Sequence, residues 1–530
     1  MEALKLMKRV LFVLFALIVP VMVWAGTPIK SYEEEYFSFL TLIGKAKRTY
    51  LMYRTINNNE YSNENGFWND SYLTKTKTNL TLYGPDVFVS YNTARPYGQN
   101  DGSLWQGVGF NARARAGLSY RAGFFSINLR PEFDFSENAE YPTMNNQFQY
   151  YWKTGSNLDK PQRFGDSSFF TLSPGDAEVR LSFGSFTFAV GYSDLWTGPT
   201  YLNSVLHSNN APTYPRLDIG VDNLKFNIPW TDIPIGTLEA HYDLGILKNS
   251  DYANVAPGEN SLLHLVTIGL RPSFFENLTL GLIVSAHTEF SWESIWDLYL
   301  AVLRGHNNDE DLKMSISFDL LFPDNGFEVY GEVGQDDRFI YVINSFHTVV
   351  WQLGAKKAFT LSREKDLYLQ LICEFGNMTM SHDAFINWPL NFYTHSGVKA
   401  SYSNLGQLLG AGTGWAGNSQ YAALQLYHKK GMVELFFQKS NPDNNYILAQ
   451  VANTGKTWPK MDPEYYCFKG IIDIGARTVF NLFDGMSVST SLVYEYIAND
   501  HYREGEVIPE GEVYAWLSNW HFDLGFKYTL

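Results

Sequence analysis

The stretch of sequence that decides the fold is the C-terminal segment Trp520-His521-Phe522-Asp523-Leu524-Gly525-Phe526-Lys527-Tyr528-Thr529-Leu530. Its even-numbered positions are all apolar or aromatic, and its odd-numbered positions are all polar, charged or glycine. Because successive side chains of a β-strand point to opposite faces, this alternation predicts a strand with one apolar and one polar face. A strand of about 9–11 residues with this pattern is long enough to cross an outer membrane.

The same alternation recurs in hairpins along the chain. One predicted strand runs from Phe110 to Tyr120, and its partner returns from Phe125 to Phe135. Tight connections rich in turn-forming residues occur near residues 121–123, 184–185, 230–235, 272–277, 323–326, 362–365, 429–431 and 482–485. Longer polar connections alternate with them, near residues 93–106, 137–175, 193–215, 248–261, 288–311, 335–345, 376–420, 440–470 and 498–519.

This alternation of short and long connections predicts the architecture. Outer-membrane barrels have short periplasmic turns and longer external loops. A chain that begins and ends in the periplasm and makes eight tight turns has 18 strands. The turns near residues 230 and 272 are the weakest signals, which leaves 16 strands as the alternative. We therefore predict an all-β fold, a transmembrane antiparallel β-barrel of about 18 strands over residues 77–530.

Two general features agree with a barrel. No run of about 18 apolar residues follows residue 25, which argues against transmembrane helices. A closed β-barrel can also cross lipid, because each strand bonds its backbone groups to the neighbouring strands. Aromatic residues make up 16% of the chain, an excess that aromatic girdles at two membrane interfaces would explain.

Residues 1–25 have the pattern of a secretory signal peptide. Lys5, Lys8 and Arg9 precede an apolar stretch over residues 10–24, which ends at small residues suited to cleavage. We expect the mature chain to begin at Gly26, and an uncleaved anchor helix is the alternative.

Residues 26–76 predict a short helical segment on the periplasmic side. Ser31 and Glu34 fit a capping box at the start of a helix. Apolar residues then recur at helical spacing as far as Ile43, and Gly44 is suited to end the helix.

Composition and motifs exclude several functions. The formal net charge of −15 disfavours nucleic acid as a partner. Only Cys373 and Cys467 are present, too few for a disulfide framework or a zinc site, and their pairing is undecided. Residues 412–417 have dinucleotide-type glycine spacing without the strand–helix context, and residues 191–195 lack the second glycine of a hydrolase elbow. We expect no cofactor, no metal site and no enzymatic activity.

Charges of both signs fall on the predicted inward face. The main ones are Arg113, Arg115, Arg130, Glu132, Asp134 and Arg180. They predict either a lumen held by ion pairs or a selective pore. The mixed signs favour the ion pairs, because a selectivity device usually concentrates one sign.

Two long connections, residues 193–216 and 395–420, combine aromatic rings with amides and arginine. The residues that we single out are Trp196, Asn209, Asn210, Arg216 and Trp415. A sugar ring needs an apolar platform and planar hydrogen-bond partners, which this set supplies. The same residues would also suit the packing of loops over the barrel mouth, and the residue types leave both interpretations open.

The same connections carry a family resemblance. Segments that resemble signature segments of the capsule-assembly Wzi family are Trp196-Thr197-Gly198-Pro199, residues 208–212, residues 406–412, Asn418-Ser419-Gln420, Tyr83-Gly84-Pro85 and residues 97–107. The resemblance covers most of the mature chain in order. It implies an outer-membrane barrel of 18 strands with a helical periplasmic part, which binds capsular polysaccharide and organises it at the cell surface.

We therefore expect an outer-membrane barrel whose external loops bind exported, capsule-like polysaccharide without catalysis. The five loop residues above are the predicted contacts. The expected partners are surface polysaccharide and outer-membrane lipid, with polysaccharide export machinery as a further candidate. The alternative is a diffusion porin, general or substrate-selective.

Overall fold

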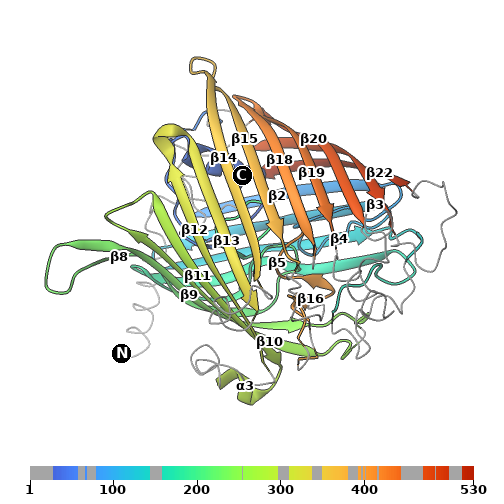
Figure 1. Ribbon diagram of the computed structural model, residues 1–530, viewed down its shortest axis with the longest axis horizontal. Coiled ribbons are helices and arrows are strands. Elements are labelled where there is room, and N and C mark those ends of the chain that lie inside the picture. The colour runs from blue at the N-terminus through green and yellow to red at the C-terminus, as the bar shows by residue number, and fades with distance from the viewer. Residues whose placement is uncertain are drawn as a thin grey trace, which may run out of the picture.

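The structure is a computed structural model, drawn in Figure 1. It describes residues 28–57, 66–68, 79–143, 158–253, 255–296, 310–336, 349–379, 392–395, 398–399, 401–414, 417–442, 469–483, 485–500 and 516–529. The predicted signal peptide, Trp415 and Cys467 lie outside the described residues. The predicted boundaries at residues 25 and 76 also fall outside them, so this division of the chain stays a prediction.

Eighteen antiparallel strands close into one barrel (Figure 1). Each strand pairs with its neighbours along the chain, and the first barrel strand pairs with the last to close the ring. The strands are β2 (Leu80–Asn92), β3 (Gly109–Ala122), β4 (Phe125–Ser136), β5 (Phe169–Phe183), β6 (Phe186–Tyr192), β8 (Arg216–Asn227), β9 (Pro234–Lys248), β10 (Asn260–Pro272), β11 (Leu278–Glu289), β12 (Glu310–Phe322), β13 (Phe327–Asp336), β14 (Val349–Ser362), β15 (Leu367–Asn377), β18 (Asn418–His428), β19 (Gly431–Asn441), β20 (Gly470–Phe483), β21 (Met486–Ala498) and β22 (Trp516–Thr529). The prediction of 18 strands is confirmed, and the alternative of 16 is excluded.

The barrel has an apolar outer face and a polar inner face. In β22, the outward side chains of Trp520, Phe522 and Leu524 are 48%, 50% and 44% exposed. The alternate residues His521 and Asp523 point inward and are only 3% and 8% exposed. The alternation that predicted a membrane-crossing strand is therefore confirmed in three dimensions.

All eight predicted tight connections join consecutive strands at one end of the barrel, and the long connections lie at the other end. In Figure 1 the hairpins β8–β9, β12–β13 and β14–β15 turn at the left and the top of the view. Gly184 and Gly326 occupy two of these turns with φ of 63° and 56°, a left-handed conformation that glycine adopts without strain. The β12–β13 turn also contains a short 3-10 helix, η2 (Pro323–Asn325).

One long connection is shorter than predicted. The loop expected over residues 137–175 ends at residue 168, because β5 already begins at Phe169. Pro174 and Gly175 look like loop residues in the sequence, but they lie at a bulge where Arg130 of β4 opposes both Gly175 and Asp176. A bulge accommodates a residue that cannot donate to the ladder, so the strand continues past the proline.

The predicted N-terminal helix is confirmed as α2 (Tyr32–Leu42). The Ser31 side chain accepts a hydrogen bond from the N–H of Glu34 at 3.3 Å, and Gly44 follows the helix with φ of 72°. The helix lies inside the barrel, at the end of the tight turns, and not beside it. Its Phe39 ring stacks on inward-facing Tyr427 of β18, with 4.1 Å between ring centroids. The aromatic side chains of α2 thus find a buried surface on the barrel wall.

An apolar core occupies another part of the lumen. Two small sheets lie in it, one of β1 (Tyr53–Arg54) with β7 (Trp196–Thr197) and one of β16 (Ser403–Asn404) with β17 (Gln407–Leu408). The core joins these segments to the inward residues Leu247, Leu263, Leu265, Ile283 and Val350 of the wall. Part of the inner face is therefore apolar and packs against chain segments instead of water.

Two smaller observations complete the fold. A short helix, α3 (Trp292–Trp296), lies in the connection between β11 and β12, at the bottom of Figure 1. Among the described residues, no helix combines the length and hydropathy needed to span a membrane.

We expect Leu424→Arg to destabilise the barrel by about 2–4 kcal/mol, because it places a charge near the middle of the lipid-facing side of β18. Leu424 is 46% exposed on the outer face. The matched control is Leu361→Arg, next to the last residue of β14 beside a tight turn, where the cost should be about 0–1 kcal/mol. Guanidinium unfolding in lipid vesicles measures both values. Equal costs at the two depths would contradict a lipid-embedded outer face.

Candidate functional site in the lumen

The segment that follows α2 is held to the barrel wall by one carboxylate. The backbone N–H groups of Leu51, Met52 and Tyr53 donate to the Glu239 carboxylate, with N–O distances of 2.8, 2.6 and 2.8 Å. Glu239 lies on the inward face of β9 and is fully buried. The carboxylate replaces the water that the amides of an irregular segment would otherwise need.

The wall is shaped to receive this segment. Gly269 of β10 faces inward, and a Cβ atom there would lie 2.7 Å from the Cβ of Leu51, so only glycine leaves the necessary room. The Tyr53 ring stacks on His241 with 3.8 Å between ring centroids. The Tyr53 hydroxyl also donates to Asp243 at 2.9 Å. Three alternate residues of β9, Glu239, His241 and Asp243, therefore hold residues 51–53 against the wall.

A second carboxylate holds the connection between β6 and β8. The N–H groups of Tyr201, Leu202 and Asn203 donate to Glu374 of β15, with N–O distances of 2.7, 3.0 and 2.9 Å. Glu332 of β13 accepts another N–H group of the same loop at 3.1 Å. Residues 193–215, expected as an external loop, therefore enter the lumen and bind its wall.

Three connections bind one another inside the mouth of the barrel. The Ser208 N–H donates to the Leu409 carbonyl at 2.7 Å, which links the β6–β8 connection to residues 401–414. The Gly102 N–H donates to the Asn209 carbonyl at 2.9 Å, which links it to the β2–β3 connection. Together with α2 and residues 50–57, these connections form a plug, a name used below for residues 28–57, 97–107, 193–215 and 401–414.

The six predicted lumen charges lie on the inward faces of β3, β4 and β5. Their ion pairs, with the N–O distance for each, are Arg113–Asp134 (2.8 Å), Arg113–Glu132 (3.7 Å), Arg115–Glu132 (3.2 Å), Arg115–Asp86 (2.9 Å), Arg130–Asp176 (3.1 Å), Arg180–Glu178 (3.0 Å) and Arg180–Asp218 (2.8 Å). Each charge thus has a neighbour of opposite sign. Any role beyond this pairing stays a prediction.

Two of the predicted polysaccharide contacts are buried beside the N-terminal segment. Trp196 is fully buried, and its ring centroid lies 4.5 Å from Lys30 Nζ and 5.1 Å from Arg54 Cζ. These are cation–π contacts, which occupy the aromatic face that was expected to meet a sugar. Arg216 is 4% exposed and forms an ion pair with Asp243 at 3.0 Å.

The other two described candidates connect loops. Asn209 is 6% exposed, and its Nδ2 donates to the Asn100 carbonyl at 3.1 Å. Asn210 is half-buried, and its Nδ2 donates to the Leu408 carbonyl at 2.9 Å. Trp415 lies outside the described residues. The structure thus brings Trp196 and Arg216 together around residues 53–54, and it puts both asparagines between loops. A part for any of the five in binding polysaccharide stays a prediction.

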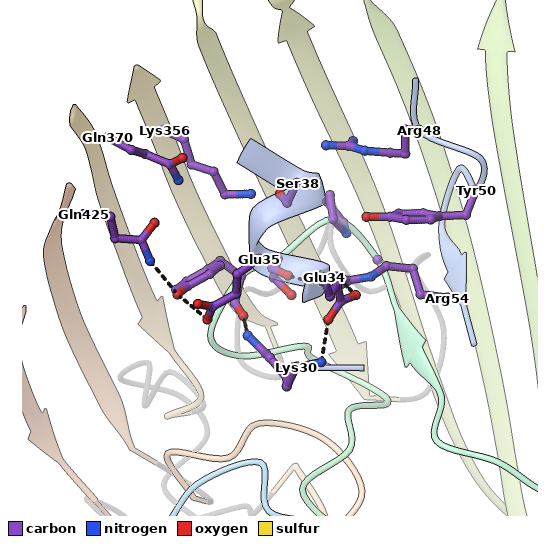
Figure 2. Close-up of a pocket in the computed structure, with 14 residues that line it drawn as sticks. Lys30, Glu34, Glu35, Ser38, Arg48, Tyr50, Arg54, Lys356, Gln370 and Gln425 are labelled. Carbon is purple, nitrogen blue, oxygen red and sulfur yellow. Dashed lines mark hydrogen bonds and ion pairs between the residues drawn. The ribbon is translucent and has the colours of Figure 1, made fainter. Parts of the chain in front are cut away.

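Figure 2 shows a small cavity between α2, residues 198–201 and the inward faces of β14, β15 and β18. Its volume of about 30 Å³ suffices for about two water molecules at roughly 10–15 Å³ each. Lys356 and Gln370 reach it from the wall, and Lys30 and Arg54 reach it from the plug (Figure 2). The cavity is too small for a sugar unit, so we assign it a structural role.

Lys30 joins α2 to the β6–β8 connection in this cavity. Its Nζ donates to the Tyr201 carbonyl. Burial, together with the nearby Arg54 guanidinium, lowers the pKa of Lys30 to about 8. The ammonium group is therefore charged at neutral pH and loses its proton above about pH 8.

His207 provides a neutral contact in the same connection. Its Nδ1 lies 3.0 Å from the Leu195 carbonyl oxygen and its Nε2 lies 2.6 Å from the Tyr214 hydroxyl. A neutral ring satisfies both partners, because Nδ1–H donates to the carbonyl and Nε2 accepts from the hydroxyl. Burial and the Arg216 guanidinium lower the pKa of His207 to about 3, which keeps the ring neutral.

The site offers little for metal chemistry. Within the described part of the chain, no group of three or more His, Cys, Asp or Glu side chains is arranged to hold a metal ion. What the arrangement does provide is a set of interlocked loops, anchored by buried carboxylates and ion pairs, that occupies the lumen.

Comparison with known proteins identifies the family. The sequence model of the family described as capsule assembly protein Wzi matches residues 87–507. The chain belongs to the Wzi capsule-assembly family. The resemblance predicted from the loop segments is thereby confirmed. The predicted location of this barrel in the outer membrane is confirmed as well. None of the curated proteins is similar enough in sequence to be matched.

A solved structure shares the fold. It is Wzi of Escherichia coli, described as an outer membrane protein involved in group 1 capsule assembly and a carbohydrate-binding β-barrel. The TM-score is 0.59 at 10% sequence identity, over 95% of this chain and 99% of that one.

Two further solved structures are less similar. OprD of Pseudomonas aeruginosa has a TM-score of 0.37 at 10% identity, over 85% of this chain and 93% of that one. OccAB2 of Acinetobacter baumannii has a TM-score of 0.41 at 8% identity, over 85% of this chain and 98% of that one. Likeness at this level bears on neither the interior nor the function.

The sequence gives only a weak signal for the residues that organise the lumen. Glu239 and Glu374 occupy inward positions of alternating strands, where a glutamate suggests a wet pore wall. Their partners are backbone amides 171–188 residues away, which no local pattern identifies. Glu374 has Ile372 and Gly376 as inward neighbours on β15. Glu239 instead has Thr237 and His241 on β9, so no shared local pattern identifies the two anchors.

We expect Glu374→Leu to speed amide hydrogen exchange at residues 201–203 by about tenfold or more, because three hydrogen bonds to a charged acceptor are lost. Glu374→Gln keeps one acceptor oxygen and should show a smaller effect. Glu276→Leu, at an exposed position in the β10–β11 turn, is the control and should leave these amides unchanged. Wild-type exchange rates in Glu374→Leu would show that the carboxylate does not hold the loop.

We expect acid to lower the free energy of unfolding more in the wild-type protein than in the His207→Gln variant. The pKa of His207 is lower in the folded chain than its usual value of 6.5, so the unfolded chain binds more protons as pH falls below 6.5. Between pH 7 and pH 5 the difference should reach about 2 kcal/mol in the free energy of unfolding. Denaturant titrations at both pH values measure it. The control Asn325→Gln, at an exposed turn position without a titratable side chain, retains His207 and should follow the wild type. Parallel pH profiles for His207→Gln and wild type would contradict the assignment.

Proposed function

We propose that this protein binds an exported surface polysaccharide through its external loops and helps to assemble it at the cell surface. It does so without catalysis. Two observations support the proposal: membership of the Wzi capsule-assembly family and the fold shared with a carbohydrate-binding barrel of that name. The partners are the polysaccharide and, as a further candidate, the machinery that exports it.

The observation that carries the proposal is the filled lumen. A diffusion porin needs a water-filled channel along its axis. Here the plug packs into an apolar core with the wall, and its amides are bound by Glu239, Glu332 and Glu374. A protein whose interior is given over to holding its loops in place presents a binding surface rather than a conduit.

An exposed aromatic group suits the external surface that such binding requires. Tyr252, in the connection between β9 and β10, is 50% exposed. Its ring lies edge-on to Phe164 with 5.9 Å between centroids, and Phe164 lies 4.9 Å from Trp105. Arg163, which precedes Phe164, donates to the Asn138 carbonyl at 2.7 Å. A rigid ring next to polar groups is a platform on which a sugar can stack.

The residues predicted from the loop motifs have a supporting part in this proposal. Trp196, Asn209 and Arg216 are almost fully buried and fix the β6–β8 connection, and Asn210 ties it to the neighbouring loop. We propose that they maintain the shape of the loop surface. Trp415 belongs to the same group of loops by its position in the sequence.

We expect the purified barrel to bind the surface polysaccharide of its own bacterium, and Tyr252→Ala to weaken that binding about tenfold, since stacking on an aromatic ring is lost. The matched control is Trp230→Ala, which removes a fully exposed ring at the tight-turn end, in the β8–β9 turn. Surface plasmon resonance on barrels in nanodiscs measures both variants.

Planar-bilayer recordings separate the rival function. The proposal expects no steady conductance of porin size from the full chain. A wild-type barrel that conducts steadily and retains no polysaccharide would favour the diffusion porin. Polysaccharide binding that is unaffected by Tyr252→Ala would move the contact to another part of the loop surface.

A further inference from the structure

A second, larger cavity lies inside the barrel on the side of β2, β3 and β4. Its volume is about 220 Å³. The wall contributes Arg115, Glu132 and Ser489, and the plug contributes Tyr32, Asp194 and Asn209. None of the functions described above uses this space.

Two acceptors that line the cavity have no donor. The Asn209 side chain is more than nine-tenths buried, and its Oδ1 has no hydrogen-bond partner in the described part of the protein. The Asp194 N–H donates to Asp176 Oδ1 at 3.0 Å, but no described group donates to the Asp194 carboxylate. Asp194 is half-buried, but a buried acceptor such as Asn209 Oδ1 is costly unless something supplies a donor to it.

The charges around these acceptors restrict what that ligand can be. The Arg113 and Arg115 guanidinium groups line the same cavity and disfavour a metal or ammonium cation. Glu132 and Asp86, which form ion pairs with Arg115, line it too and disfavour an anion. A neutral ligand with several hydroxyl groups fits both conditions, because each hydroxyl donates to a free acceptor and accepts from a guanidinium.

The size and the position of the cavity restrict the ligand further. Ligand sites for drug-sized molecules span roughly 300–1,000 Å³, so about 220 Å³ suits a single ring rather than a polymer chain. The lining includes Ser487, the second residue of β21, and Lys527, near the end of β22, so the cavity reaches toward the tight-turn end. The Gly102–Asn209 hydrogen bond closes it toward the external loops.

We propose that this cavity binds one sugar unit, which enters from the periplasmic side. Asp194 and Asn209 accept hydrogen bonds from its hydroxyl groups, Arg115 donates to them, and the Tyr32 ring lies against the sugar. The inference takes its ligand class from the proposed function, but it adds a second, internal site that is separate from the external loop surface.

Saturation-transfer NMR with the full-length barrel in detergent tests the proposal, with free hexoses, N-acetylhexosamines and hexuronic acids as probes. At least one neutral sugar should bind. Asp194→Asn should weaken it about tenfold, because an acceptor oxygen is replaced by an NH2 donor while the side-chain shape is kept. Ser489→Trp should abolish binding by filling the cavity. Asp232→Asn in the exposed β8–β9 turn and Ala114→Trp on the outer face of β3 are the matched controls and should bind as wild type.

A second measurement guards against variants that fold poorly. Ser489→Cys is made in a chain that carries Cys373→Ser and Cys467→Ser, and a small maleimide alkylates the new thiol. Bound sugar should slow this alkylation about tenfold. An alkylation rate that saturating sugar leaves unchanged would overturn the proposal, as would cavity variants that bind sugar as tightly as wild type.

The two proposals fail in different ways. If intact polysaccharide binds to the wild type while no free sugar does, the internal site is wrong and the external function stands. If free sugar binds and is lost in Asp194→Asn while intact polysaccharide does not bind at all, the external function is wrong and the cavity assignment stands.

Discussion

Buried carboxylates that accept backbone N–H groups are the interaction on which the interior of this barrel depends. Glu239 and Glu374 each bind three successive amides of segments that have little regular structure. A buried amide without a partner costs about 1–3 kcal/mol, so six of them would prevent these segments from entering the lumen. With the amides satisfied, apolar residues of the plug can pack against Leu263 and Leu265 of the wall.

The fold was largely predictable because its signals are local. Side-chain alternation in segments such as Trp520–Leu530 and turn residues at short connections identify strands one pair at a time, and their sum gives the barrel. Prediction failed where a strand tolerates an irregularity, as at Pro174 and Gly175, which lie at a bulge inside the ladder. The position of α2 within the lumen also had no local signal, since it follows from aromatic stacking on Tyr427 nearly 400 residues later.

The candidate site was less predictable for the same reason. Trp196 and Arg216 have the chemistry of sugar contacts, but the structure uses them in cation–π and ion-pair contacts with residues 53–54 and Asp243. Residue type and position in a loop therefore do not distinguish a ligand platform from an internal contact. Contacts with residues far away in the sequence decide between these two uses. Membership of the Wzi family supports the polysaccharide role that residue chemistry alone left open.

The pairing of β2 with β22 has a consequence for biogenesis. Residues 28–57 precede β2 along the chain and lie within the ring, while β22 ends the described sequence and completes the circle. β2 can meet β22 only after all eighteen barrel strands have been made. Residues 28–57 are therefore tied to the inner wall of a ring that only the last described strand completes, so the interior packing and the closing seam belong to one finished structure.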